Sequence, residues 1–136
     1  MKKDIPIRKV ENVLIAIVPP PDAEVQEMWA VFLINLKDEA IENVLISSRG
    51  YGSIDGQEVK TSVLRHFFEE VPGCSFVQVE LIQPRVFSLN NEFWLSFSFD
   101  DFLYDRKFTF VSGSIDEQHF SQVPLIDRRG IMIGDV

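Results

Sequence analysis

A group of three aspartates is the first candidate for chemistry. Asp100, Asp101 and Asp105 carry carboxylate oxygens, which are the ligands that a hard cation such as Ca²⁺ prefers. A calcium loop needs oxygen ligands at alternate positions, a central glycine and a closing glutamate, whereas Phe102-Leu103-Tyr104 fills the interval here. We therefore expect a solvated turn between strands at this place, and no metal site.

The histidines are the next candidates, because a hydrolytic site pairs a histidine with a nucleophile and a carboxylate. The chain has two histidines, His66 and His119, and it contains neither G-x-S-x-G nor H-E-x-x-H. If the chain is a hydrolase or a small-molecule or carbohydrate-binding protein, His66 and the Asp100/Asp101/Asp105 cluster are the polar groups to test. The sequence favours a structural or surface histidine, and we predict no catalytic residue.

A glycine-rich segment could in principle cradle a phosphate. In Gly50-Tyr51-Gly52-Ser53-Ile54-Asp55-Gly56 the backbone amides can approach an anion closely. A dinucleotide fingerprint has glycine at its sixth position and a helix after it, whereas this chain has Asp55 there and a β-rich segment follows. We expect an ordinary surface loop in which the chain turns, and no cofactor.

Four apolar residues are candidates for an interface. Trp94 alternates with a Phe-rich face, so it projects outward if the sheet is covered on one side only, and an exposed aromatic residue is a common interface anchor. The alternative is that a second layer covers Trp94, which the high aromatic content favours. The apolar tail Ile131-Met132-Ile133 predicts an edge strand that could add to the sheet of a partner.

Composition excludes several classes of partner. With 13 Lys and Arg against 21 Asp and Glu, the net charge is −8, which repels nucleic acid and anionic membranes. Cys74 is the only cysteine, so an intrachain disulfide and a multi-thiolate metal site are both excluded. We expect a soluble cytoplasmic protein without a signal peptide or membrane helix. We expect Cys74 to be a small buried hydrophobic residue.

The hydrophobic pattern predicts strands along the whole chain. The clearest period-two run is Phe93 to Phe99, with Phe93, Leu95, Phe97 and Phe99 on one face, and Phe108 and Phe110 are expected to face inward beside it. Residues 61–71 fit both a strand and a short helix, and strand is preferred. The segments expected to supply the strands are 10–18, 27–36, 41–48, 61–71, 76–81, 85–89, 93–99, 107–111, 123–126 and 131–133. We expect 27–36 to be buried on both faces and to lie antiparallel to 41–48, and we expect Asn90-Asn91 to form the turn of a β-hairpin.

These elements predict one all-β domain over residues 1–136. Short strands with turn signals at regular spacing, and no alternation of strands with helices, indicate a single antiparallel β-sandwich of about seven to nine strands, with at most one short helix at 61–71. The pattern resembles an immunoglobulin-like sandwich in architecture, but it lacks the pair of cysteines of that family. No more specific family resemblance is found.

The function that the sequence favours rests on these exclusions. We expect a non-catalytic interaction or accessory module that binds a protein partner or associates with itself. A small-molecule or carbohydrate-binding sandwich, or a hydrolase on the same architecture, is the alternative.

Overall fold

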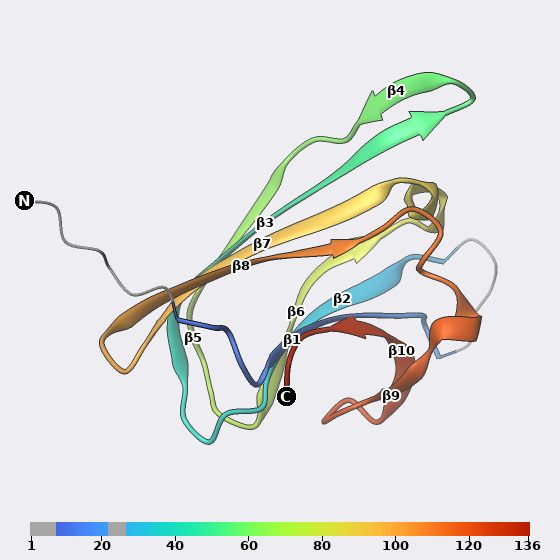
Figure 1. The fold of residues 1–136 in the computed structure, drawn as a ribbon. Coiled ribbons are helices and arrows are strands. Elements are labelled where there is room, and N and C mark those ends of the chain that lie inside the picture. Colours follow the sequence, from blue (N-terminus) through green and yellow to red (C-terminus); the bar gives the residue numbers. More distant parts are fainter. Residues whose placement is uncertain (1–7, 22–26) are drawn as a thin grey trace, which may run out of the picture.

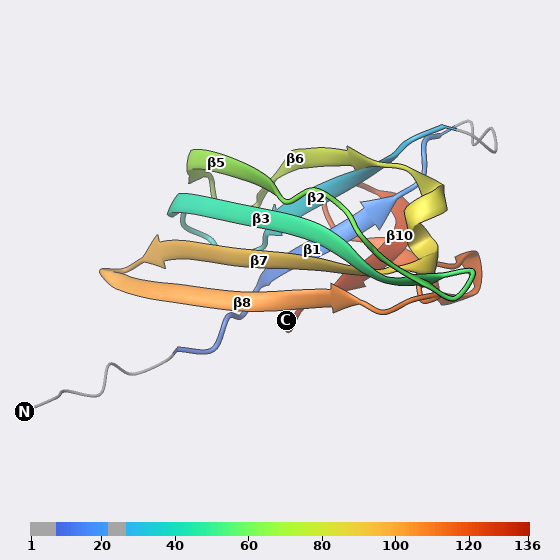
Figure 2. The same ribbon diagram turned by 90° about the horizontal axis from the view of Figure 1, so that it is seen from above.

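The computed structural model describes residues 8–21 and 27–136, which form two antiparallel β-sheets packed face to face (Figures 1 and 2). Sheet 1 has the strand order β6-β2-β1-β10-β9, with β1 (Val13–Val18), β2 (Trp29–Asn35), β6 (Ser75–Ile82), β9 (Ser121–Val123) and β10 (Arg128–Ile133). Sheet 2 has the order β4-β3-β7-β8, with β3 (Ile41–Ile54), β4 (Gln57–Lys60), β5 (Leu64–Val71), β7 (Asn90–Phe99) and β8 (Phe102–Phe110). Strand β5 pairs with β3 on the same edge as β4.

The expectation of an all-β sandwich is confirmed. The described residues contain ten strands, one more than the upper expectation, and β4 lies in a segment for which no strand was expected. Residues 61–71, for which the sequence also allows a helix, contain strand β5. In the described part of the chain the helical segments are two short 3-10 helices, η1 (Pro84–Ser88) and η2 (Glu117–His119). Neither is long and apolar enough to cross a membrane.

The strand order agrees with the immunoglobulin-like arrangement. In such a sandwich, strands A, B and E pair in one sheet, while C′, C, F and G pair in the other. Here β1, β2 and β6 have the first order, and β5, β3, β7 and β8 have the second. Strands β10 and β9 extend sheet 1 beyond β1.

The main core lies between the two sheets and follows the predicted alternation. Phe93, Leu95 and Phe97 of β7 are buried, and so are Phe108 and Phe110 of β8, as the sequence predicts. They meet a matching set of buried residues from β1 and β2 of sheet 1, which consists of Val13, Ile15, Ile17, Val31 and Leu33.

Sheet 1 is also covered on its other face. Strand β9 and the turn after it supply Val123 and Ile126 to a second apolar cluster, which contains the alternate residues of β1 and β2. Figure 1 shows β9 and β10 curling to the side of β1 that is opposite sheet 2. The expectation that residues 27–36 are buried on both faces is therefore confirmed for residues 31–35, whereas Glu27 and Met28 are exposed.

Three local expectations were wrong. Residues 85–89 form 3-10 helix η1 instead of a strand, because Pro84 lacks the amide hydrogen that a ladder needs, and Asn90-Asn91 begins β7 instead of forming a turn. The Asn91 side chain holds η1 by donating to the Val86 and Leu89 carbonyl oxygens.

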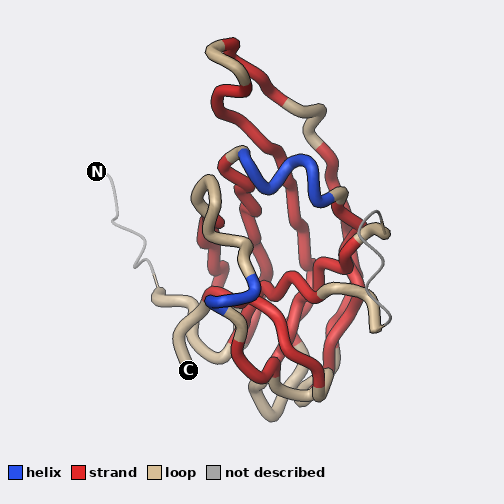
Figure 3. The backbone as a smooth tube through the Cα atoms, turned by 90° about the vertical axis from the view of Figure 1, so that its right-hand side faces the viewer, coloured by secondary structure: helices blue, strands red, loops and turns tan. Residues whose placement is uncertain are grey.

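Strand β3 continues through Gly50 and Gly52, so the chain turns only at Asp55-Gly56, where both φ angles are positive. The β3–β4 hairpin projects beyond the sandwich (Figures 1 and 3).

The connections were also mispredicted. The sequence predicts that residues 27–36 and 41–48 are antiparallel neighbours, whereas β2 lies in sheet 1 and β3 in sheet 2. The acidic connection expected at 100–105 is a two-residue turn, Asp100-Asp101, and β8 begins at Phe102. The strand expected at 123–126 is β9, which ends at Val123.

Candidate functional site

The outward side of sheet 2 presents a partly apolar surface, which we call the outer face. It is built from strands β5, β3, β7 and β8, whose outward side chains lie in two adjacent rows set by the backbone register. The first row is Phe67, Leu45, Ser96 and Asp105, and the second row is Arg65, Ser47, Trp94 and Lys107.

Large apolar side chains are exposed at the centre of the outer face. The exposed fractions are 60% for Phe67, 48% for Trp94 and 42% for Leu45. Each belongs to a strand whose alternate residues are directed into the sandwich, so the exposure follows from the pleat. Sheet 1 is covered on its outer side by β9, whereas the described residues leave these three side chains of sheet 2 open to solvent.

Charged groups border this centre. The Glu92 carboxylate lies 2.9 Å from Arg49 Nε and 3.7 Å from Lys107 Nζ, and its side chain is only 7% exposed. The Lys107 ammonium also lies 5.8 Å from the centre of the Trp94 ring. An apolar centre with a charged border is the usual composition of a protein–protein interface.

The outer face contains one of the predicted interface residues. Trp94 projects outward, as the alternation of β7 indicates, and the alternative of a covering layer is wrong for the described residues. The interface role of Trp94 stays a prediction.

The other predicted interface residues lie inside sheet 1. Ile131, Met132 and Ile133 form the end of β10 and pair with β1 in antiparallel register, so one of their backbone edges is occupied. Ile131 and Ile133 pack on the main core and Met132 packs on the second cluster. A chain ending at Gly130 would therefore lose the part of β10 that pairs with β1, and its oligomeric state would report on folding as well as on association.

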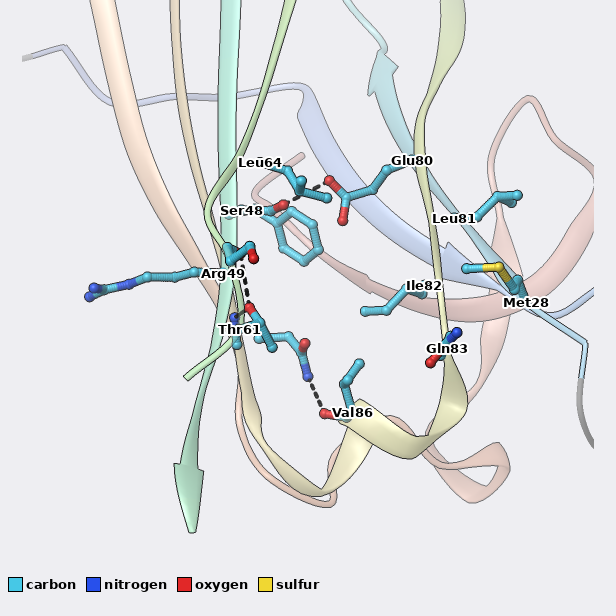
Figure 4. Close-up of a pocket in the computed structure, with 14 residues that line it drawn as sticks. Met28, Ser48, Arg49, Thr61, Leu64, Glu80, Leu81, Ile82, Gln83 and Val86 are labelled. Atoms are coloured by element: carbon cyan, nitrogen blue, oxygen red, sulfur yellow. Dashed lines mark hydrogen bonds between the residues drawn. The ribbon is translucent and has the colours of Figure 1, made fainter. Parts of the chain in front are cut away.

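A pocket of about 230 Å³ opens between sheet 2 and β6 of sheet 1 (Figure 4). It lies where the edge of sheet 2 is interrupted, between β4 and β5, and its floor is η1. Its apolar lining is Met28, Leu64, Leu81, Ile82, Val86 and Phe93. Pockets for small ligands usually have about 300–1,000 Å³, so this pocket is small.

A carboxylate whose side chain is 11% exposed lies in the wall of the pocket. Glu80 of β6 reaches across to sheet 2, where its Oε1 accepts a hydrogen bond from Ser48 Oγ at 2.7 Å and lies 2.8 Å from His66 Nε2. A nucleophilic serine donates its proton to a histidine, and the carboxylate holds the other side of that ring. Here Ser48 and His66 bind the same carboxylate oxygen, so the trio links the two sheets and is not arranged to activate the Ser48 hydroxyl.

The structure does not bring His66 and the aspartate cluster together. His66 of β5 points inward toward Glu80, whereas Asp105 lies on the outward side of β8, and strands β3 and β7 separate the two. Asp100 and Asp101 form the turn between β7 and β8. Within residues 8–21 and 27–136, no group of three or more His, Cys, Asp and Glu side chains could hold a metal ion.

Cys74 and His119 are both on the surface. Cys74 is exposed in the turn between β5 and β6, so the expectation of a buried thiol was wrong. Its backbone has a φ of 49°, and its amide donates to the Lys37 carbonyl oxygen. His119 lies in η2, where its ring Nδ1 is 3.1 Å from the Ser114 carbonyl oxygen.

Sequence reasoning missed Glu80 because a β-bulge reverses its direction. The alternation of residues 76–81 predicts Glu80 on the solvent side, opposite Val79. In the structure Val31 pairs with Glu80 and Phe32 with Gln78, so Val79 is an extra residue and Glu80 turns inward. No signal in the segment itself reveals the bulge. Phe67 and Leu45 could have been found, because both occupy outward positions of predicted strands.

Comparisons of this chain with protein-family models, with curated proteins and with solved structures gave no match.

Proposed function

We propose that this chain is a non-catalytic interaction domain that binds a protein through the outer face of sheet 2. The observation that carries the proposal is the exposure of Phe67, Trp94 and Leu45 side by side on three neighbouring strands. Contiguous exposed apolar side chains on a folded domain commonly mark an interaction site. Tryptophan is also among the residues that most often dominate binding energy.

The surroundings of these residues support a protein as the partner. The outer face extends over four strands, and its hollow of about 280 Å³ beside Trp94 is open and is bordered by the charged Arg49 and Glu92. A surface of this breadth suits a protein better than a small ligand. Arg65, Lys107 and Asp105 at its border can pair with charges on the partner and fix its orientation. The net charge of −8 makes nucleic acid an unsuitable partner.

Photo-cross-linking tests this proposal. A benzophenone amino acid replaces Phe67 in the full chain, and illumination of cells that produce the protein is expected to yield a discrete adduct with a protein. The second substitution Trp94→Glu should abolish the adduct, because it places a charge at the centre of the apolar surface. The same benzophenone at Leu125, which is exposed on the turn after β9, is the matched control. Equal adducts at both positions, or an adduct that survives Trp94→Glu, would contradict the proposal.

Small-molecule binding is a second candidate, which the Glu80 carboxylate beside an apolar pocket favours. The chemistry that fits is a small apolar amine, whose ammonium group would pair with Glu80 while its carbon atoms fill the pocket. Titration with benzylamine, followed through the methyl NMR signals of Leu64 and Ile82, tests this. Benzyl alcohol is the neutral control, and equal shifts with both compounds would argue against a role for the carboxylate.

A further inference from the structure

We infer that the partner of the outer face is a second copy of this chain, bound face to face about a two-fold axis that runs across the strands between the two rows. This inference rests on the proposed function, and it adds the identity of the partner and the geometry of the contact. Face-to-face packing of sheets with nearly aligned strands is a common mode, with the sheets about 10 Å apart.

The first argument is steric and concerns the centre of the outer face. On β3, Leu45 is followed two residues later by Ser47, and on the neighbouring β7 the register places Ser96 beside Leu45 and Trp94 beside Ser47. Large and small side chains therefore alternate in both directions. A two-fold axis across the strands lays each row over the other, so that Leu45 meets Ser47 of the partner subunit and Trp94 meets Ser96 of the partner subunit. Each large side chain then finds a small one opposite, as close packing requires.

The second argument is electrostatic and concerns the two outer strands. The same axis places Asp105 of β8 opposite Lys107 of the partner subunit, and this pairing occurs twice in a symmetric dimer. On β5 it places the Phe67 ring opposite Arg65 of the partner subunit, which allows a cation–π contact. All four strands thus meet a chemically complementary position.

The charges also favour the two-fold axis across the strands over a two-fold axis parallel to the strands, which is the other axis that a face-to-face dimer can have. A two-fold axis parallel to the strands would keep large side chains over small ones, but it would place Arg65 opposite Lys107 of the partner subunit. Two cations in that position repel each other, so the parallel axis is disfavoured.

The size of the surface sets the expected affinity. The two rows hold eight outward side chains, fewer than the roughly 20–30 residues per side of a standard stable interface. We therefore expect a dissociation constant in the micromolar range, and sedimentation equilibrium from about 5 µM to about 500 µM is the suitable measurement.

Charge reversal provides the test. Asp105→Lys sets two lysines against each other across the interface, and Lys107→Asp sets two aspartates against each other, so each variant alone should dimerise at least about tenfold more weakly than the wild type. In an equimolar mixture of the two variants, a mixed dimer places a lysine opposite an aspartate in both of its 105–107 contacts. The mixture should therefore recover association that neither variant shows alone. Glu117→Lys, a charge reversal on η2, is the matched control and should leave dimerisation unchanged. Melting curves of each variant verify that it is folded, and Glu92 keeps its contact with Arg49 when Lys107 is changed.

The outcomes separate the two proposals. Recovery of the dimer in the mixture supports the inferred geometry. A stronger dimer from Lys107→Asp alone would overturn it in favour of the parallel axis, because that change would relieve the repulsion with Arg65. A wild-type chain that is monomeric at the highest concentration, with no association in the mixture, overturns the second copy as partner. In that case the cross-link at Phe67 still decides whether the outer face binds a different protein.

Discussion

At the scale of single residues, Asn35 is a buried polar side chain that makes four hydrogen bonds. It is completely buried at the end of β2, where the chain leaves sheet 1 for sheet 2. Its Nδ2 donates to the Glu39, Val71 and Pro72 carbonyl oxygens, and its Oδ1 accepts from the Lys37 amide. One side chain thus joins the β2–β3 connection to the β5–β6 turn.

The substitution Asn35→Asp tests this role. The carboxylate has no hydrogen to donate and would face three carbonyl oxygens inside the protein, so we expect a loss of about 2–4 kcal/mol in the free energy of unfolding. Urea denaturation measures the loss. Asn43→Asp is the matched control, because Asn43 is exposed and its amide bonds to the Ser98 hydroxyl. Similar losses in the two variants would mean that the network around Asn35 contributes little.

At the scale of elements, the two connections that cross between the sheets pack against each other. Gly73 in the β5–β6 turn lies against the β2–β3 connection, where an added Cβ would come 2.3 Å from the Asp38 carbonyl oxygen. That distance is far below van der Waals contact and involves backbone, so a side chain cannot be accommodated by a rotamer change. The close approach of these turns holds β5 of sheet 2 beside β6 of sheet 1, where Glu80 reaches His66.

We therefore expect Gly73→Ala to lower the free energy of unfolding by about 2–3 kcal/mol, since one of the two turns must move. Thermal unfolding followed by circular dichroism provides the measurement. Gly56→Ala is the control, because Gly56 has a φ of 78° but nothing lies near its added Cβ. Its loss should be limited to about 1 kcal/mol of backbone strain. If Gly73→Ala is no more destabilising than the control, the turns do not restrain each other.

At the scale of the whole molecule, the two sheets differ in what covers their outward sides. Strand β9 covers sheet 1, whereas residues 8–21 and 27–136 leave the outer face of sheet 2 exposed. The two tryptophans show the same contrast. Trp29 packs edge-on against Phe87 and Phe120, with ring centres 4.9 and 5.7 Å away, and it contacts the main core. Trp94 stands on the outer face, which is therefore expected to serve binding instead of folding.

The same substitution at the two tryptophans separates these roles. Trp29→Ala removes packing that closes one end of the sandwich and should cost about 2–4 kcal/mol of unfolding free energy. Trp94→Ala should change the stability of the monomer by less than about 1 kcal/mol, because half of that side chain is already exposed to solvent. Urea denaturation at low protein concentration keeps the monomer as the reference state. A loss at Trp94 as large as that at Trp29 would assign Trp94 to the folding core.

The amino-acid sequence by itself determined the fold class, most of the strands and the direction of the residues in β7 and β8. These properties depend on the period-two alternation of polar and apolar residues, which is local and is visible in a single strand. The outward position of Trp94 follows from the same alternation. The sequence also excluded a disulfide framework, because Cys74 is the only cysteine.

Only the tertiary structure decided which strands pair, where β6 bulges, and which outward side is covered. These features depend on contacts between residues far apart in the chain, and alternation carries no information about the neighbour of a strand. For this reason β2 and β3 were mistaken for neighbours, Glu80 was placed on the wrong side of β6, and the meeting of Ser48, His66 and Glu80 was not foreseen. The outer face has the same origin, because its two rows exist only once β5, β3, β7 and β8 lie side by side in one register.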